Sequence, residues 1–383
     1  MKSVRPLPHR PVATIAAIIT LSLSAPVLAE KYEFDVRNSG TTATPIEQPD
    51  PAYPQSLEDS GQEGWVRMHF AVAPDGRAID PLIIDSSGGP AFEDEARKAL
   101  ASWRFTPPES GKEDAHNLVN IRSEIRGSRD SATFGFRRDH QRIVLDLVHE
   151  RNEDARAKMD ELYASGGFNT YESTMLWLMM GRVDGAENND AGKLECYRRA
   201  LAVSTPRTLR VENKRGLLEK IFELEDQFGH YSNALQAFRS LKAASGDLEV
   251  NQGIAARAAQ IQELVDGDEN IVARASIYNP CDCGTGEPLW YYKPARRTFS
   301  FANLSGNVTR FEARCENQRV QGPVEAGTEW ALAPEWGSCR VFVFGDDGAT
   351  FEFVEHPAGA EDDASTAVAD DDVLDPRNRG QRS

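Results

Sequence analysis

The sequence lacks the short motifs that usually mark an enzyme. Its 383 residues contain no His-Glu-x-x-His, no Gly-x-Ser-x-Gly and no glycine-rich phosphate-binding loop. The pair His149-Glu150 has no second histidine one helical turn further on. We therefore predict no catalytic residue, no metal site and no cofactor, and we expect that the protein is not an enzyme.

Positive charge is also scarce. The chain has 43 Lys and Arg against 60 Asp and Glu, which gives a formal net charge of −17. An acidic surface of this kind repels phosphate backbones and anionic headgroups. We therefore predict no nucleic-acid partner.

Long apolar runs are confined to the N-terminus. Three basic residues precede an apolar stretch from 12 to 24, and Ala29 ends a permissive cleavage site. This pattern is typical of a secretory signal peptide over residues 1–29, which we expect to be cleaved near Ala29. Its removal would change the net charge to −17 − 3 = −20. The alternative is an uncleaved anchor in the inner membrane, although the run is short for a membrane span.

Cysteine is rare, and its distribution is uneven. Cys196 stands alone, whereas Cys281, Cys283, Cys315 and Cys339 lie in the last third. In an exported chain such a cluster favours disulfides, and three pairings are open. We favour Cys315 with Cys339, because each would lie on a predicted strand of one small sheet. Cys281 and Cys283 would then pair or stay reactive, and the alternative for them is a redox or metal site.

The segment from 44 to 126 has a strand–strand–helix–strand pattern. Residues 65–72 alternate apolar and polar side chains, Asp75-Gly76 is a hairpin signal, and 79–85 forms a second strand. A helix follows and ends before Pro107-Pro108, and a last strand begins at Leu118. One face of the sheet should bury Val66, Met68, Phe70, Val72, Ile83, Leu100, Trp103 and Phe105.

This order resembles the C-terminal domain of TonB, a periplasmic protein that grips outer-membrane transporters. The motifs that carry the resemblance are Pro51-Ala-Tyr53-Pro54, Glu63-Gly64-Trp65 and Trp103-Arg104-Phe105. The resemblance implies a periplasmic domain, here over residues 46–126, that holds peptides and does no chemistry. Its implied partner is an envelope protein or peptide, of which an outer-membrane transporter is one example.

We expect the last strand of this domain to form an edge of the sheet. Residues 30–45 are expected to form a linker in a loop conformation, so no upstream strand is predicted to cover that edge. An open edge presents unpaired main-chain groups and can capture an extended peptide by strand addition. The predicted peptide-binding edge consists of Val119, Ile121, Ser123 and Ile125. The alternative is that the following domain covers it.

Residues 139–265 are rich in Ala, Leu, Glu, Arg and Lys and read as helices. Trp177-x-x-Met180-Gly181 and Gly229-x-Tyr231-x-x-Ala234 resemble tetratricopeptide repeats, in which small residues let paired helices approach closely. A plain helical bundle is the alternative. Residues 275–357 then carry strand signals of a small all-β domain, and 358–383 form an acidic tail that we expect to be disordered.

The sequence therefore predicts a multidomain α+β protein of the cell envelope. The first functional hypothesis is a periplasmic adaptor that holds an extended peptide by strand addition. The second is a TonB-type energy transducer, although only about sixteen residues, roughly 60 Å when stretched, separate the cleavage site from the domain. The third is a redox or metal-binding protein that uses Cys281 and Cys283.

Overall fold

A computed structural model describes most of the chain between Tyr32 and Pro357. The described ranges are 32–38, 43–58, 62–87, 89–125, 131–246, 248–277 and 287–357. The predicted signal peptide, Cys281, Cys283 and the acidic tail lie outside these ranges.

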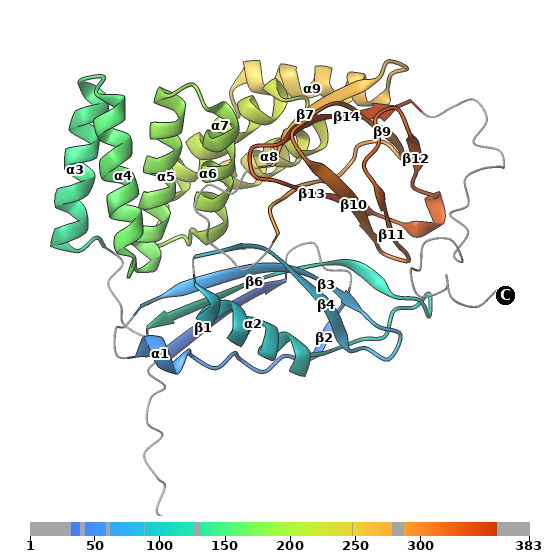
Figure 1. Ribbon diagram of the computed structural model, residues 1–383, viewed down its shortest axis with the longest axis horizontal. Helices are drawn as coiled ribbons and strands as arrows, with labels where there is room; N and C mark the ends of the chain where they lie inside the picture. Colours follow the sequence, from blue (N-terminus) through green and yellow to red (C-terminus); the bar gives the residue numbers. More distant parts are fainter. Residues whose placement is uncertain are drawn as a thin grey trace, which may run out of the picture. The chain divides into compact units, whose positions relative to one another are not determined.

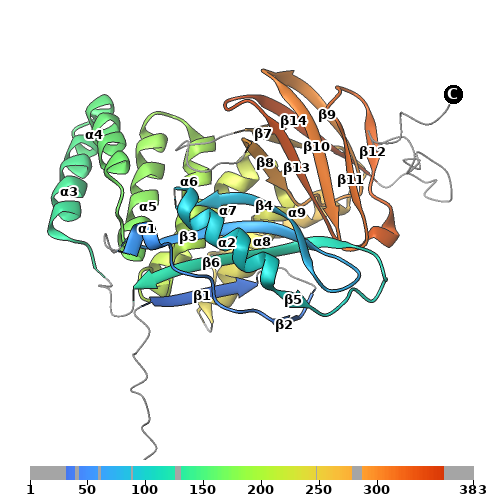
Figure 2. The same cartoon turned by 60° about the horizontal axis from the view of Figure 1, so that its bottom comes forward.

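The N-terminal region is an antiparallel sheet with one long helix on it. We call the sheet of β1, β6, β3 and β4, in that order, the N-terminal sheet. Figures 1 and 2 show α2 along one of its faces. The elements are β1 (Tyr32–Asn38), β2 (Pro45–Glu47), α1 (Gln55–Glu58), β3 (Gly64–Val72), β4 (Ala78–Ser86), α2 (Pro90–Ser102), β5 (Arg104–Phe105) and β6 (Asp114–Ile125).

The apolar face of this sheet is the predicted one. Alternate residues of β3 point beneath α2, because side chains of a strand alternate between its two faces. The Trp103 indole donates a hydrogen bond to the Pro49 carbonyl over 2.9 Å, which fixes the segment before α1. All predicted core residues are buried in this one cluster: Val66, Met68, Phe70, Val72, Ile83, Leu100, Trp103 and Phe105.

The region upstream of the domain differs from the prediction. Residues 30–45 were expected to form a loop, yet they contain all of β1 and the first residue of β2. β1 pairs with β6 from Tyr32 opposite Ile125 to Asn38 opposite Val119. The linker prediction is therefore wrong for these residues. β1 pairs with a strand that is distant in the sequence, so no hairpin turn next to β1 marks it as a strand.

Seven helices follow within the part of the chain that the structure describes. They pack mainly as the consecutive hairpins α3–α4, α5–α6 and α7–α8, which Figure 1 shows as successive rods. Such stacking agrees with a helical repeat, and the tetratricopeptide identity stays a prediction. The helices are α3 (Phe134–Val148), α4 (Asn152–Ser165), α5 (Thr170–Ala186), α6 (Asp190–Val203), α7 (Val211–Gln227), α8 (Tyr231–Ser245) and α9 (Gln252–Asp266).

Close approach of paired helices depends on a glycine, as the repeat pattern predicted. A Cβ atom on Gly181 of α5 would lie 2.6 Å from the Tyr197 ring of α6. The ring therefore packs directly against the backbone of the neighbouring helix. None of the helices in the described ranges is both long and apolar enough to cross a bilayer.

The C-terminal region is all β, as predicted. It contains two four-stranded antiparallel sheets, ordered β11-β10-β13-β8 and β12-β9-β14-β7, around a core rich in phenylalanine. The elements are β7 (Ile271–Ser276), β8 (Leu289–Tyr292), β9 (Thr298–Ser305), β10 (Val308–Cys315), β11 (Arg319–Pro323), β12 (Glu329–Ala331), η1 (Pro334–Trp336), β13 (Cys339–Gly345) and β14 (Thr350–His356).

One disulfide joins two neighbouring strands of this region. Cys315 of β10 lies directly opposite Cys339 of β13, and the two are bonded. The predicted pairing is thus confirmed. Cys196 on α6 is a free, buried thiol.

The hairpin turn between β3 and β4 depends on Gly76. Its φ is +80°, and a Cβ atom there would lie 2.3 Å from the Phe105 carbonyl oxygen. That contact exists because the Phe105 amide donates a 2.8 Å hydrogen bond to the Gly76 carbonyl. The turn and β5 therefore share a space that admits only glycine.

We expect Gly76→Ala to destabilise the N-terminal region more than Gly111→Ala does. Gly111 also has a positive φ, +66°, but no atom lies within 4 Å of its Cβ position. Gly111→Ala should lower the free energy of unfolding by about 1–2 kcal/mol from backbone strain alone. Gly76→Ala should add about 1–3 kcal/mol from the steric clash. Chemical denaturation followed by tryptophan fluorescence would measure both, and equal losses would contradict the argument.

Candidate functional site

The predicted peptide-binding edge is not an edge. β6 lies between β1 and β3, so its main-chain groups are paired on both sides. Val119 and Ile121 point into the core beneath α2, and Ser123 is buried as well. The assignment of Val119, Ile121, Ser123 and Ile125 to a free edge is therefore wrong, and the reason is the upstream strand β1.

β4 forms one of the two outer edges of the N-terminal sheet, and it is blunted. Asp80 has a φ of +48° and Pro81 follows it, so the strand is irregular and lacks one main-chain donor. Arg314 donates a 3.0 Å hydrogen bond to the Asp80 carbonyl, and the Arg319 guanidinium lies 2.8 Å from its carboxylate. These features protect β4 against pairing with another strand.

β1 forms the other outer edge. Within the described parts of the chain, β6 is its only paired strand. Alternate residues of β1 therefore direct their N–H and C=O groups away from the sheet. Arg122 of β6 forms an ion pair with Asp35 of β1, and this ion pair adds to the main-chain pairing of the two strands.

The second face of the sheet is buried beneath the other regions. His69 lies on the polar side of β3, yet it is only 1% exposed. The centre of its ring lies 4.9 Å from that of Phe342, and burial lowers its pKa well below the ordinary value. This side of β3 is covered because its polar side chains meet residues that are distant in sequence.

Side chains of β6 attach the same face to the end of α6. Asn120 donates to the Ala202 carbonyl over 2.9 Å. One nitrogen of Arg122 donates to the carbonyls of Val203 and Ser204 over 3.0 and 3.1 Å. The last carbonyls of a helix have no partner within the helix, so these side chains supply the missing donors.

A buried ion pair joins β4 to α6. The Arg199 guanidinium lies 3.2 Å from the Asp85 carboxylate and 4.9 Å from the centre of the Trp177 ring. Burial raises the pKa of Asp85 to about 7, and Arg199 only partly offsets this effect. Asp85 thus titrates near neutral pH.

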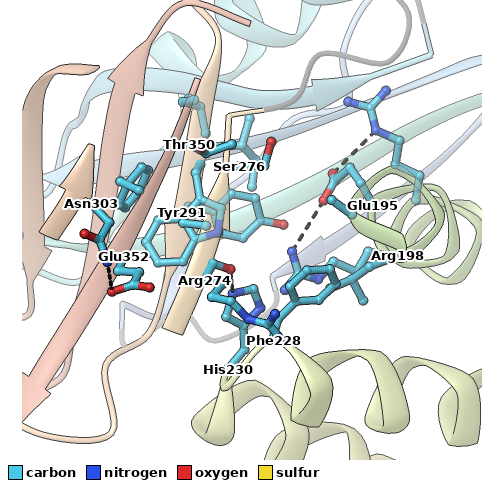
Figure 3. A pocket seen from close by; sticks show the side chains of 18 residues that line it. Glu195, Arg198, Phe228, His230, Arg274, Ser276, Tyr291, Asn303, Thr350 and Glu352 are labelled. Atoms are coloured by element: carbon cyan, nitrogen blue, oxygen red, sulfur yellow. Dashed lines mark hydrogen bonds and ion pairs between the residues drawn. The ribbon is translucent and has the colours of Figure 1, made fainter. Parts of the chain in front are cut away.

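A cavity of about 430 Å³ lies beside this pair. Figure 3 shows Arg198 and Glu195 of α6 on one side and His230 and Tyr291 among the other lining residues. Its wall is largely aromatic and aliphatic, and it includes Phe228, Leu194, Leu289, Trp290 and Phe351.

Several charged groups around this cavity form a network of ion pairs and hydrogen bonds. Arg198 donates two hydrogen bonds to Glu225, over 2.9 and 2.7 Å. His230 links the same carboxylate, at 2.9 Å, to the Arg274 carbonyl, at 2.8 Å. Although burial raises the pKa of Glu225, Arg198 and His230 outweigh it and lower that pKa. A satisfied network of this kind suits positioning and binding rather than proton transfer.

No short sequence motif predicted this cavity. Its residues come from β4, from α6, from the α7–α8 turn and from strands of the C-terminal region, so only the folded chain brings them together. Cys281 and Cys283 lie outside the described residues, and the redox or metal hypothesis for them stays a prediction. Across the described ranges, no group of His, Cys, Asp and Glu has the arrangement of a metal site.

Comparison with known proteins relates the N-terminal region to a family. Residues 49–123 match the family model "Gram-negative bacterial TonB protein C-terminal". Protein TonB of Pseudomonas aeruginosa is 37% identical over 67 residues, which cover 18% of this chain and 20% of that protein. Protein TonB of Escherichia coli is 26% identical over 129 residues, which cover 34% of this chain and 53% of that protein.

The solved structures include a similar domain. The solution NMR structure of the P. aeruginosa TonB C-terminal domain is 30% identical, covers 23% of this chain and 90% of that chain, and has a TM-score of 0.20. The chain thus matches about half or less of the length of these TonB relatives. Residues 32–38, which form β1, precede the segment that the family model matches.

We expect the stability of the protein to fall between about pH 4 and pH 7 because of Asp85. Its pKa is raised from 3.8 to about 7 on folding, so its contribution is full below the unfolded pKa and is lost as the pH rises through the folded one. The loss should approach about 4 kcal/mol. Urea denaturation from pH 4 to pH 8 should show this slope in the wild type but not in Asp85→Asn.

Asp75→Asn is the matched control. Asp75 is an exposed carboxylate whose pKa is lowered by its hydrogen bond to Arg77, so it stays ionised over most of this range. Asp75→Asn should keep the wild-type slope above pH 5. Parallel pH profiles for the wild type and Asp85→Asn would contradict the assignment.

Proposed function

We propose that the protein is an exported, protein-binding adaptor of the cell envelope. In this proposal the TonB-like region holds an extended segment of a partner by strand addition, and no chemistry is done. The proposal is carried by a TonB-like sheet whose outer strand, β1, pairs with β6 on one side and with no other strand of the described residues on its outer side. The docking strand is therefore β1 and not β6.

The physical basis is the main chain of β1. Its outward N–H and C=O groups can form a regular ladder with an incoming strand, whereas β4 is irregular at Asp80 and Pro81. Because main-chain groups supply the affinity, the partner segment needs an extended conformation more than a strict sequence. Side chains at alternate positions would add selectivity.

The helical region offers a second surface for a protein partner. Phe134, Leu145 and Val148 of α3 are 76%, 54% and 67% exposed. Their spacing places them on one side of the helix, since residues eleven and fourteen positions apart lie close to the same face. An apolar stripe of this kind on a soluble surface favours protein contact.

We expect a variant that lacks residues 32–38 to lose the partner. Deletion removes the outer strand and exposes the β6 edge beneath it. Crosslinked pull-down from the cell envelope, compared with the full chain, would measure the loss, and the near-ultraviolet circular dichroism of Trp65 and Trp103 would report whether the sheet persists. Unchanged capture by a folded variant would refute the proposal. Increased capture would show that the partner binds the newly exposed edge of β6 instead.

A second variant separates the main chain from the side chains. Replacement of residues 32–38 by an alternating Thr-Val segment of the same length keeps a strand that can pair on both sides. If main-chain pairing supplies the affinity, this variant should retain the partner that the deletion loses. Loss in both variants would show instead that particular side chains of β1 are required.

The alternative is an energy transducer of the TonB type. The relatives that carry the name Protein TonB favour it. That function would need the N-terminal segment to remain as an anchor in the inner membrane, whereas an adaptor would be released into the periplasm after cleavage near Ala29.

Cell fractionation and N-terminal sequencing distinguish the two functions. For the adaptor we expect the protein in the periplasmic fraction with a mature chain that begins near Glu30. An intact chain in the inner-membrane fraction would support the transducer instead. An Ala29→Lys variant, which removes the small residue before the cleavage site, should accumulate as the longer form if cleavage occurs there.

A further inference from the structure

A second cavity, of about 320 Å³, lies where residues from all three regions meet. Arg67 of β3 and Leu118 of β6 line it from the N-terminal sheet, and Arg340 of β13 with Lys293, just after β8, line it from the C-terminal region. Helices α6, α7 and α8 supply the remaining wall. We call it the cationic cavity. It shares Arg198 and Tyr291 with the cavity of Figure 3.

Three cations of this cavity have no carboxylate partner among the described residues. Among the residues that the structure describes, no Asp or Glu forms an ion pair with Arg67, Lys293 or Arg340. Instead, Arg67 donates to the Tyr291 hydroxyl over 3.2 Å, and a guanidinium nitrogen of Arg340 lies 2.8 Å from His69 Nε2. Both guanidinium groups lie about 6 Å from the centre of the Tyr291 ring, at 5.9 and 6.0 Å.

The arginines that are almost fully buried each have an acidic partner: Arg122 has Asp35, Arg199 has Asp85 and Arg314 has Glu312. The half-buried Arg67 and Arg340 have none among the described residues. The chain carries 60 acidic residues, so carboxylates are not in short supply. Arg67 and Arg340 are half-buried and Lys293 is exposed, yet the three cations lie around one cavity and repel one another, so an anion between them would relieve that repulsion.

The surrounding groups do not neutralise them. Glu225, the acidic residue in the lining, is engaged by Arg198 and His230. Asp85 lies across from Arg67 on the paired strand and attracts it at a distance, but its ion pair is with Arg199. Glu316 attracts Lys293 less than Arg340 and Arg239 repel it. Burial lowers the pKa of Arg340 to about 10 and also lowers that of Lys293.

Two histidines beside the cavity add polar groups without adding charge. Burial lowers the pKa of His116 to about 4 and that of His69 well below its ordinary value, so both are neutral at pH 7. Neither ring nitrogen of His116 has a hydrogen-bond partner among the described residues.

The rest of the wall is divided between apolar and amide side chains. Leu118, Leu201, Leu218 and Ile221 form an apolar surface. Asn233, Gln236 and Ser240 of α8 present further polar groups. Pockets for small organic ligands combine a mainly apolar wall with a few polar groups in this way, and 320 Å³ lies near the lower end of their usual volume.

We infer that the cationic cavity binds a small organic anion. Its carboxylate or phosphate head would be held by Arg67, Lys293 and Arg340, and its short apolar body would lie against Leu118 and Leu201. Guanidinium groups suit such a head because they donate several hydrogen bonds in one plane. This inference does not depend on the proposed peptide-binding role of β1.

Binding is tested with two probes, inorganic phosphate and octanoate, on the mature full-length protein. Calorimetric titration should show saturable binding of octanoate with an affinity at least tenfold above that for phosphate, because octanoate alone uses the apolar wall. If octanoate does not bind at up to about 10 mM, a weak affinity for a small ligand, the inference fails. Phosphate binding at equal affinity would also overturn the predicted apolar part of the site.

Variants locate the binding. Lys293→Gln and Arg340→Gln should each weaken octanoate binding about tenfold or more. Arg310→Gln removes the same charge from a half-exposed residue paired with Glu287, and its affinity should stay within about twofold of the wild type. Equal weakening by Arg310→Gln and Lys293→Gln would refute the site. Lys293 has no side-chain hydrogen bond to the described residues, so Lys293→Gln remains informative if Arg340→Gln unfolds.

Discussion

The arrangement of the described regions depends on the hydrogen bonds that Arg122 makes at the end of α6. Arg122 is 1% exposed, and its guanidinium reaches the carbonyls of Val203 and Ser204 as well as the carboxylate of Asp35. A positive group at a helix C-terminus is favoured by the helix dipole and satisfies carbonyls that would otherwise be unpaired. One side chain thus connects the first strand, the central strand and the helical region.

The N-terminal sheet therefore has two buried faces of different chemistry. The face beneath α2 is apolar and forms an ordinary core. The opposite face carries Arg67, His69, Asn120 and Arg122 and meets groups from distant parts of the chain. Most of these polar groups find partners there, as burial requires. The cations around the second cavity differ in that no carboxylate of the described residues forms an ion pair with them, and for that reason they favour an anionic ligand.

Local patterns predicted much of the fold. Alternation in residues 65–72 gave the correct buried face of β3, and the spacing of Trp, Tyr, Ala and Gly predicted a helical region with closely packed hairpins. The Cys315–Cys339 pairing was also predictable, because both cysteines stand on strand-like segments. Each of these features depends on neighbours within a few residues or on the strand character of short segments.

The prediction of the site failed where segments that are distant in the sequence meet. β1 covers β6, and α6 and β13 cover the polar face of β3, yet nothing within residues 114–125 or 64–72 indicates which segment would arrive. The pairing of β1 with β6 has a consequence for biogenesis. Asp35 and Arg122 are 87 positions apart, so β1 stays unpaired during synthesis until β6 has also left the ribosome.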